Sequence, residues 1–293
     1  MSDKKRDQHY VPQMYLRRFA DSHGHVYVYD LERKQSYRNL PRKFAFEKYF
    51  YDLDLSSTYE ILEEYSPFLT EEQRRNLSNE QLVEDWLSGI EGAANTVLDQ
   101  LESGKTTAEV DMVPIASFIY TLSKRTRQRR VQMQRVVEQM GEIYEEFETV
   151  YRPAQYKHST LLTKEFAKKE HIKRLVSLSG LQKFCGVLLM NYSCCIANVD
   201  SDLSFIISDN PSLIFEEGAK SFCFPISPKK ALIFSLRETD TIKSESDMFE
   251  DKIITLGTSS VIEYNSIQMR QALRFLYGDE ATINHMINKE EIK

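Results

Sequence analysis

The chain has 293 residues and a formal net charge of −6, and 41% of its residues are hydrophobic. Its 10 Gly and 8 Pro make up about half of the average share of these two residues, which is roughly 12% of a chain. So few loop-forming residues favour helix. No two glycines are separated by a single residue, and no G-x-x-x-x-G-K-[ST] occurs, so the familiar phosphate-binding loops are excluded. The acidic balance argues against general nucleic-acid binding, although a local basic patch would override it. An anion site here must therefore be built from side chains.

Three absences in the sequence bear on the compartment of the protein and on the redox state of its cysteines. No apolar run approaches the ~20 residues that span a bilayer, and the first seven residues, Met-Ser-Asp-Lys-Lys-Arg-Asp, lack the apolar stretch of a secretory signal. The four cysteines form no C-x-x-C pair, which favours reduced thiols over a zinc site. We therefore expect a cytoplasmic location and no membrane contact.

The first 53 residues predict a small β piece. Valine and tyrosine alternate in Val26-Tyr-Val-Tyr-Asp30, which is typical of a strand, and a second run can pair back across Glu32-Arg33-Lys34. In chain order, the predicted elements are an extended entry with a short helix (9–19), a turn (21–25), the two hairpin strands (26–30 and 35–39) and a further extended segment (44–53).

Helical periodicity dominates residues 79–190. The predicted helices cover 79–102, 112–150, 163–178 and 181–190, and Gly104 marks the end of the first. If the second is unbroken, it spans on the order of 55 Å. One apolar stripe of this long helix consists of Met133, Val136, Met140, Ile143 and Phe147.

After Asn191 the pattern changes to short runs of β-branched and aromatic residues. We expect an antiparallel meander over 191–237, with strands at 193–199, 204–208, 212–215, 222–226 and 231–236, and a C-terminal helix over 259–277. Both β pieces are short, which favours one shared sheet. The segregated order predicts an α+β fold in a single domain (1–293), with a helical block, including one long helix, packed on a small, mostly antiparallel sheet.

Charged residues interrupt the apolar stripes of two predicted helices. Glu91 lies on the row of Leu87, and Arg125 follows Phe118 and Leu122, with Arg129 continuing the same row. An isolated buried charge is too costly to be tolerated, so these groups are paired or line a polar cavity. Two interpretations stay open: a structural Glu91–Arg125 ion pair, or convergence with other polar groups in a site.

Two further segments place polar side chains beside ordered structure. Ser208-Asp209-Asn210-Pro211 follows a buried run, so a strand end would present a carboxylate and an amide; the alternative is an Asx turn bonded to local backbone. His9 precedes the first short helix. It would serve as a metal ligand or a general acid/base, or else make a structural hydrogen bond.

The segment from Lys124 to Arg135 holds six cations in twelve residues and no acid. Five glutamates follow on the same predicted helix, at 138, 142, 145, 146 and 148. One interpretation is a solvated helix whose two halves pair with neighbours or with another subunit. The other is a local phosphate-binding face.

Several short motifs occur together in this chain. They include Gln8-His-Tyr-Val-Pro12, Tyr15-Leu-Arg-Arg-Phe19, Glu47-Lys-Tyr-Phe50, Ile90-Glu-Gly92, Arg125-Thr126, Ile207-Ser-Asp-Asn-Pro211 and Phe224-Pro-Ile-Ser-Pro228. In this combination, over residues 8–277, the chain resembles the bacterial family known as domain of unknown function 4238.

The resemblance implies a single intracellular domain and brings no established reaction. It implies that His9, Glu91, Arg125, Asp209 and Asn210 form one cluster. Where such sequences tend to have proline after Arg-Thr, this chain has Arg127, so we expect an unbroken long helix.

Two functions from different classes fit these observations. The first is a metal-dependent hydrolase acting on a phosphate ester, as a nuclease or nucleotide hydrolase does. His9, Glu91 and Asp209 would then be catalytic and hold a divalent cation, while Arg125, Arg129 and Asn210 would bind the phosphate-bearing substrate. The alternative is a non-catalytic binding or interaction module, in which the polar cluster only fixes the core.

Overall fold

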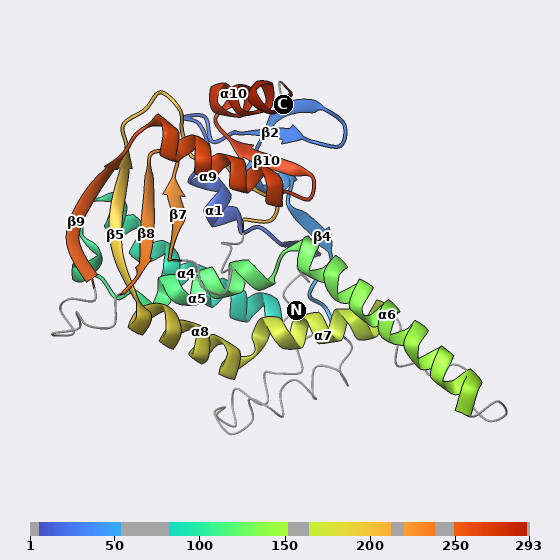
Figure 1. The fold of residues 1–293 in the computed structure, drawn as a ribbon. Helices are drawn as coiled ribbons and strands as arrows, with labels where there is room; N and C mark the ends of the chain where they lie inside the picture. The colour runs from blue at the N-terminus through green and yellow to red at the C-terminus, as the bar shows by residue number, and fades with distance from the viewer. Residues whose placement is uncertain (1–5, 54–81, 152–163, 212–219, 238–248, 292–293) are drawn as a thin grey trace.

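The computed structural model describes residues 6–53, 82–151, 164–211, 220–237 and 249–291 (Figure 1). The predicted strand at 212–215 lies outside these residues. Within them the fold is α+β, as predicted. None of the helices in these ranges combines the length and apolar character that a bilayer-spanning helix needs. The single-domain organisation over 1–293 stays a prediction.

Strands in the described ranges form three separate sheets. The smallest pairs β1 (Asp7–His9) with β4 (Phe46–Lys48). The second has the order β3-β2-β10-β6 and is antiparallel throughout; its strands are β2 (Val26–Asp30), β3 (Gln35–Asn39), β6 (Ile207–Ser208) and β10 (Phe275–Gly278). The third has the order β7-β8-β5-β9, with β5 (Tyr192–Val199), β7 (Ser221–Ser227), β8 (Lys230–Leu236) and β9 (Phe249–Leu256).

The helical block lies against the third sheet, and α9 and α10 lie beside the second (Figure 1). Within the block α5 packs against α4, α7 and α8, and α6 packs against α7. The helices are α1 (Gln13–Arg17), α4 (Leu82–Glu102), α5 (Val113–Lys124), α6 (Arg127–Tyr151), α7 (Lys164–Val176), α8 (Leu178–Asn191), α9 (Thr258–Gln271) and α10 (Glu280–Glu291), with 3-10 turns η1 (Pro41–Lys43) and η3 (Thr107–Glu109).

The prediction of one unbroken helix over 112–150 is wrong. α5 ends at Lys124 and α6 begins at Arg127, without a proline or glycine at the junction. Thr126 supplies the reason, because its hydroxyl accepts the backbone N–H of Arg129 at 3.3 Å. A threonine that accepts from the third residue beyond it is an N-cap, which begins a new helix.

The predicted meander over 191–237 is also wrong. The β6 strand, which lies between β5 and β7 in the chain, pairs with β10 in the second sheet. β5 is flanked by β8 on one side and, in parallel, by β9 on the other. The two predicted β pieces therefore share a sheet only in part: β2 and β3 lie in one sheet with β6, while β5, β7 and β8 belong to another.

The predicted C-terminal helix over 259–277 is wrong in its last part, because α9 ends at Gln271 and residues 275–278 form strand β10. The predicted β2–β3 hairpin is confirmed, with Val26 opposite Asn39 and Asp30 opposite Gln35.

Tyr15 joins three parts of the fold in one buried core. Its ring stacks on Phe224 of β7 at 5.6 Å and meets Phe118 of α5 edge-on at 5.7 Å. Its hydroxyl donates to the backbone oxygen of Pro225 at 2.8 Å, so the ring is buried without leaving a polar group unsatisfied. This contact fixes α1, the helical block and the third sheet against one another.

Candidate functional site

Arg125 lies at the centre of a buried polar network at the α5–α6 junction. Its side chain is 1% exposed, and all three guanidinium nitrogens are engaged. Nη1 donates to Oε1 of Glu91 at 2.6 Å, Nη2 donates to the backbone oxygen of His9 at 2.5 Å, and Nε donates to the hydroxyl of Tyr51 at 3.2 Å. The structure thus brings together three of the predicted site residues, His9, Glu91 and Arg125.

Tyr51 is a member of this network that the sequence did not reveal. Its hydroxyl lies 3.2 Å from the backbone oxygen of His9 and 3.4 Å from that of Arg125, and it donates to them. Burial raises the pKa of Tyr51 to about 12, although Arg125 acts in the opposite direction. The hydroxyl therefore stays protonated and connects the end of β1 to the end of α5.

The side chains proposed as metal ligands do not meet in this network. The backbone oxygen of His9, and not its ring, contacts Arg125; the buried ring packs on Phe46 at 5.3 Å, with Nδ1 3.4 Å from Nε2 of Gln13. Among the residues that the structure describes, no three His, Cys, Asp or Glu side chains gather where they could hold a metal ion.

Asp209 and Asn210 form hydrogen bonds with backbone groups at the end of α9 and in the segment before β10. The two carboxylate oxygens of Asp209 accept the backbone N–H groups of Leu273 and Arg274, at 2.8 and 2.9 Å. The amide of Asn210 donates to the backbone oxygen of Gln271 at 3.2 Å, the last residue of α9. The Asx-turn alternative anticipated bonding to backbone, but these partners lie about 60 residues away in the sequence.

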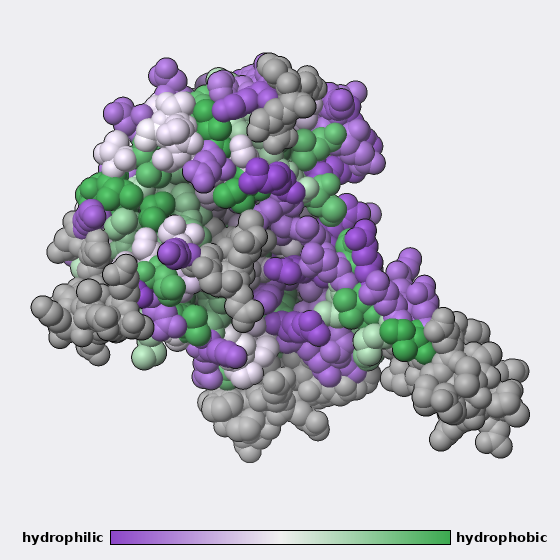
Figure 2. Space-filling model, in the orientation of Figure 1, coloured by the Kyte–Doolittle hydropathy of each residue, from purple (hydrophilic) through white to green (hydrophobic). Residues whose placement is uncertain are grey.

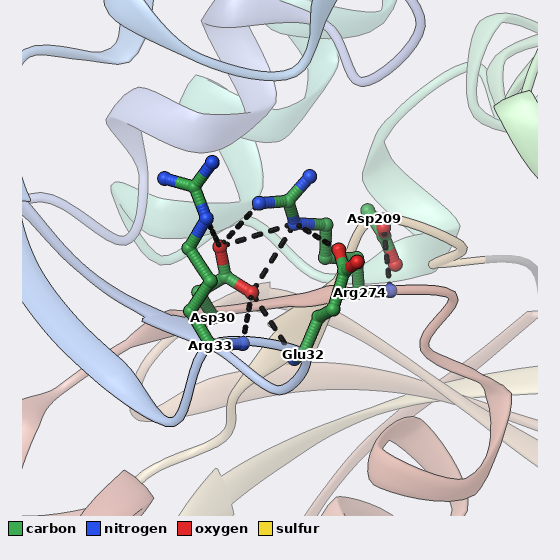
Figure 3. A network of polar contacts seen from close by, with 5 residues as sticks. All are labelled: Asp30, Glu32, Arg33, Asp209 and Arg274. Carbon is green, nitrogen blue, oxygen red and sulfur yellow. Dashed lines mark hydrogen bonds and ion pairs between the residues drawn. The ribbon is translucent and has the colours of Figure 1, made fainter.

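Burial governs the protonation of the Asp209 carboxyl. Burial raises its pKa to about 6, against the lowering effect of the backbone N–H groups of Leu273, Phe275 and Arg274. The side chain of Arg274 does not neutralise Asp209, because it turns to Asp30, with Nη2 2.7 Å from Oδ2 (Figure 3). That hydrogen bond lowers the pKa of Asp30.

A pocket of about 720 Å³ lies where α5, α6, α7 and α8 meet, and four cationic side chains line it: Lys124, Arg129, Arg174 and Lys183. None of the described residues that line it carries a carboxylate. We call this the basic pocket; its other lining residues are Tyr120, Ser123, Gln128, Gln132, Ser177, Gly180, Phe184, Val187, Leu188, Asn210 and Gln271. Figure 2 shows hydrophilic side chains gathered over α6 and α7 in this region.

The positive charge of the basic pocket is not compensated within the described chain. No described carboxylate lies within 4 Å of the charged nitrogens of Lys124, Arg129, Arg174 or Lys183. Partial burial lowers the pKa of Lys124, and the charges of Arg129 and Arg174 lower it further. A lysine whose charge is disfavoured by like charges gains most from a bound anion, so the pocket favours anionic ligands.

Aromatic and aliphatic side chains also line the basic pocket, and together we call them the apolar wall. Tyr120 and Phe184 face each other with ring centroids 5.6 Å apart, beside Val187 and Leu188. Gly180 allows the first turn of α8 to approach this wall, because a Cβ there would lie 2.7 Å from the hydroxyl of Tyr120. The pocket therefore offers both cationic and apolar side chains to a ligand, with Nζ of Lys124 5.8 Å from the centroid of the Tyr120 ring.

The structure divides the predicted site residues among three places. Arg129 and Asn210 line the basic pocket, whereas His9, Glu91 and Arg125 form the buried network and Asp209 caps the turn after α9. Within the predicted basic run, Lys124 and Arg129 face the pocket. Three others have partners elsewhere: Arg125 is in the buried network, Arg127 lies 2.9 Å from Glu47, and Arg130 donates to His171 at 2.8 Å.

Arg174 and Lys183 come from α7 and α8, and no local pattern marks them. Arg174 occupies the last turn of an ordinary amphipathic helix, and Lys183 is an isolated cation. Only the packing of α7 and α8 against α5 brings them to the run at Lys124.

The geometry can be set beside known proteins. No curated protein and no solved structure matches the chain. One family matches residues 7–282, nearly the whole length, so the resemblance stated from the sequence motifs is confirmed. The chain belongs to the family described as Protein of unknown function (DUF4238).

Proposed function

We propose that this protein is a binding module for a small phosphate-bearing ligand, held in the basic pocket, and that the Glu91–Arg125 network is structural. The observation that carries the proposal is the convergence of four cationic side chains on one pocket whose described lining has no carboxylate. Arginine is well suited to this task, because its planar guanidinium binds phosphate oxygens in pairs.

The cationic side chains and the apolar wall of the basic pocket together indicate the class of ligand. Lys124, Arg129, Arg174 and Lys183 would contact the phosphate oxygens, and the Tyr120–Phe184 wall would accept a flat apolar group. A volume of about 720 Å³ falls within the range of ordinary small-molecule sites, roughly 300–1,000 Å³. A nucleoside phosphate combines both features.

The geometry supports the metal-dependent hydrolase less well. That function needs carboxylate oxygens turned toward a common metal, yet Oε1 of Glu91 accepts from Arg125 and both oxygens of Asp209 accept backbone N–H groups. A cytoplasmic location belongs to the same proposal, and free cysteines at 185, 194, 195 and 223 are in keeping with it.

The proposal is tested by ligand-dependent thermal stability. We expect ATP to raise the Tm of the wild-type protein more than inorganic phosphate does, because only ATP also reaches the apolar wall. Reversing both charges in Arg174→Glu/Lys183→Glu should weaken ATP binding by roughly 100-fold or more, since each charge-assisted hydrogen bond contributes about 1.5–3 kcal/mol. Isothermal titration calorimetry measures the change in Kd.

A matched control is Lys105→Glu, which reverses an exposed charge outside the pocket and should leave ATP affinity unchanged. Both pocket side chains are exposed, so the double variant should keep the wild-type Tm without ligand. Equal ATP affinity in the wild type and the double variant would contradict the proposal. Release of phosphate from ATP with Mg²⁺ or Mn²⁺, abolished in Glu91→Gln, would favour the hydrolase instead.

A further inference from the structure

α6 extends away from the body of the protein as an arm (Figure 1). It has 25 residues and so measures on the order of 37 Å, whereas α7, which packs against it, has 13 and measures on the order of 20 Å. Met133 and Val137 anchor the base of the arm against Ala167 of α7. The helix that covers α6 is therefore only about half as long as the arm.

An apolar stripe continues outward along the arm and becomes progressively more exposed. Met133 is 8% exposed, Val136 46%, Met140 55% and Ile143 67%. Their spacing alternates between three and four residues, and in the sequence Phe147 and Val150 continue it. A stripe of this period is the pattern by which one helix packs along another. Single exposed apolar residues are common on surfaces, but three in one line on an extended helix indicate an interaction surface.

Charge along α6 is divided between its two halves. Residues 127–135 contain four arginines and no acid, whereas residues 136–151 contain five glutamates and no base. Two copies of α6 packed in parallel would place like charges together. Two copies packed antiparallel would place the glutamate-rich half of each beside the arginine-rich base of the other.

We infer that the α6 arm is a self-association surface that pairs antiparallel with the arm of a second copy of this chain. The antiparallel arrangement has twofold symmetry, so it closes as a dimer and buries the same stripe in both copies. The exposed Arg135 near the base of one arm would then lie near the acidic half of its partner. This inference does not depend on the proposed ligand.

Analytical ultracentrifugation across roughly 1–100 µM tests the pairing. We expect the wild-type protein to approach twice its monomer mass of 34.3 kDa, and Met140→Glu and Ile143→Glu to remain monomeric. The matched control is Ile253→Glu on β9, which changes an isoleucine that is 54% exposed and should leave the dimer intact. Circular dichroism should show the wild-type fold in all three variants.

Orientation is tested by oxidative cross-linking. Residue 139 is at the middle of α6 and so lies near the twofold axis of an antiparallel pair. The variant Gln139→Cys should therefore form a disulfide between the two copies. Gln132→Cys should not, because in an antiparallel pair its two positions are on the order of 20 Å further apart. A monomeric wild type, a dimer that survives Ile143→Glu, or equal cross-linking of the two cysteine variants would each overturn the inference. ATP binding in the Ile143→Glu monomer separates this result from the test of the basic pocket.

Discussion

Replacing Arg125 with methionine is expected to lower the free energy of unfolding by about 3–5 kcal/mol, the usual cost of removing one partner of a buried ion pair. The substitution leaves the backbone oxygen of His9, the hydroxyl of Tyr51 and the carboxylate of Glu91 without their common donor. Urea denaturation followed by circular dichroism measures the difference.

Two further variants separate this effect from a simple loss of charge. Glu91→Gln should cost about 3 kcal/mol, because the amide keeps an oxygen acceptor but leaves the charge of Arg125, whose side chain is 1% exposed, without its carboxylate. Arg125→Lys should not restore stability, because an ammonium is a single point of charge and cannot reach three partners as a guanidinium does. If Arg125→Met cost less than about 1 kcal/mol, the network would not be holding the fold, and a catalytic role would regain support.

Asp209 should make the protein more stable as the pH falls from 7 to 5. Burial raises its folded-state pKa to about 6, above an unfolded value of about 3.9. Between these two values the folded state binds more protons than the unfolded state, so the stabilisation is present at low pH and is lost as the pH rises through 6. The expected gain between pH 7 and pH 5 is about 1–2 kcal/mol.

The matched variant is Asp209→Asn, which has no carboxyl to titrate. At pH 7 it should be less stable than wild type by about 1–3 kcal/mol, because its NH₂ group would face a backbone N–H of Leu273 or Arg274. The difference between the two proteins should widen on acidification. A difference that stays constant from pH 7 to pH 5 would show that Asp209 is not the titrating group.

Periodicity in the sequence predicted part of the buried network and several of the local elements. Glu91 and Arg125 interrupt apolar rows, which predicted that they would be paired or would line a polar cavity, whereas no pattern marked Tyr51. The β2–β3 hairpin was predictable because its strands are separated by only four residues. The apolar stripe from Met133 to Ile143 was also visible, but only the structure shows that it is buried at one end and exposed at the other.

The features that the sequence did not predict depend on contacts between residues far apart in the chain. Local pattern continues helix through 272–277, but Asp209 and Asn210 take up the backbone groups at the end of α9 and direct the chain into β10. The basic pocket was missed for a similar reason. Half of its cations come from Arg174 and Lys183, which reach Lys124 only through helix packing.

The position of β10 sets an order of events in folding. β10 lies between β2 and β6, and the Arg274–Asp30 ion pair beside it joins residues 244 positions apart in the sequence. The β2–β3 hairpin is local and can form early, whereas closing so long a loop is slow. Until β10 arrives, one edge of β2 has unpaired backbone groups beside Val26 and Val28, and such edges are where chains aggregate. Completion of the second sheet thus covers a strand edge that a newly made chain would otherwise expose.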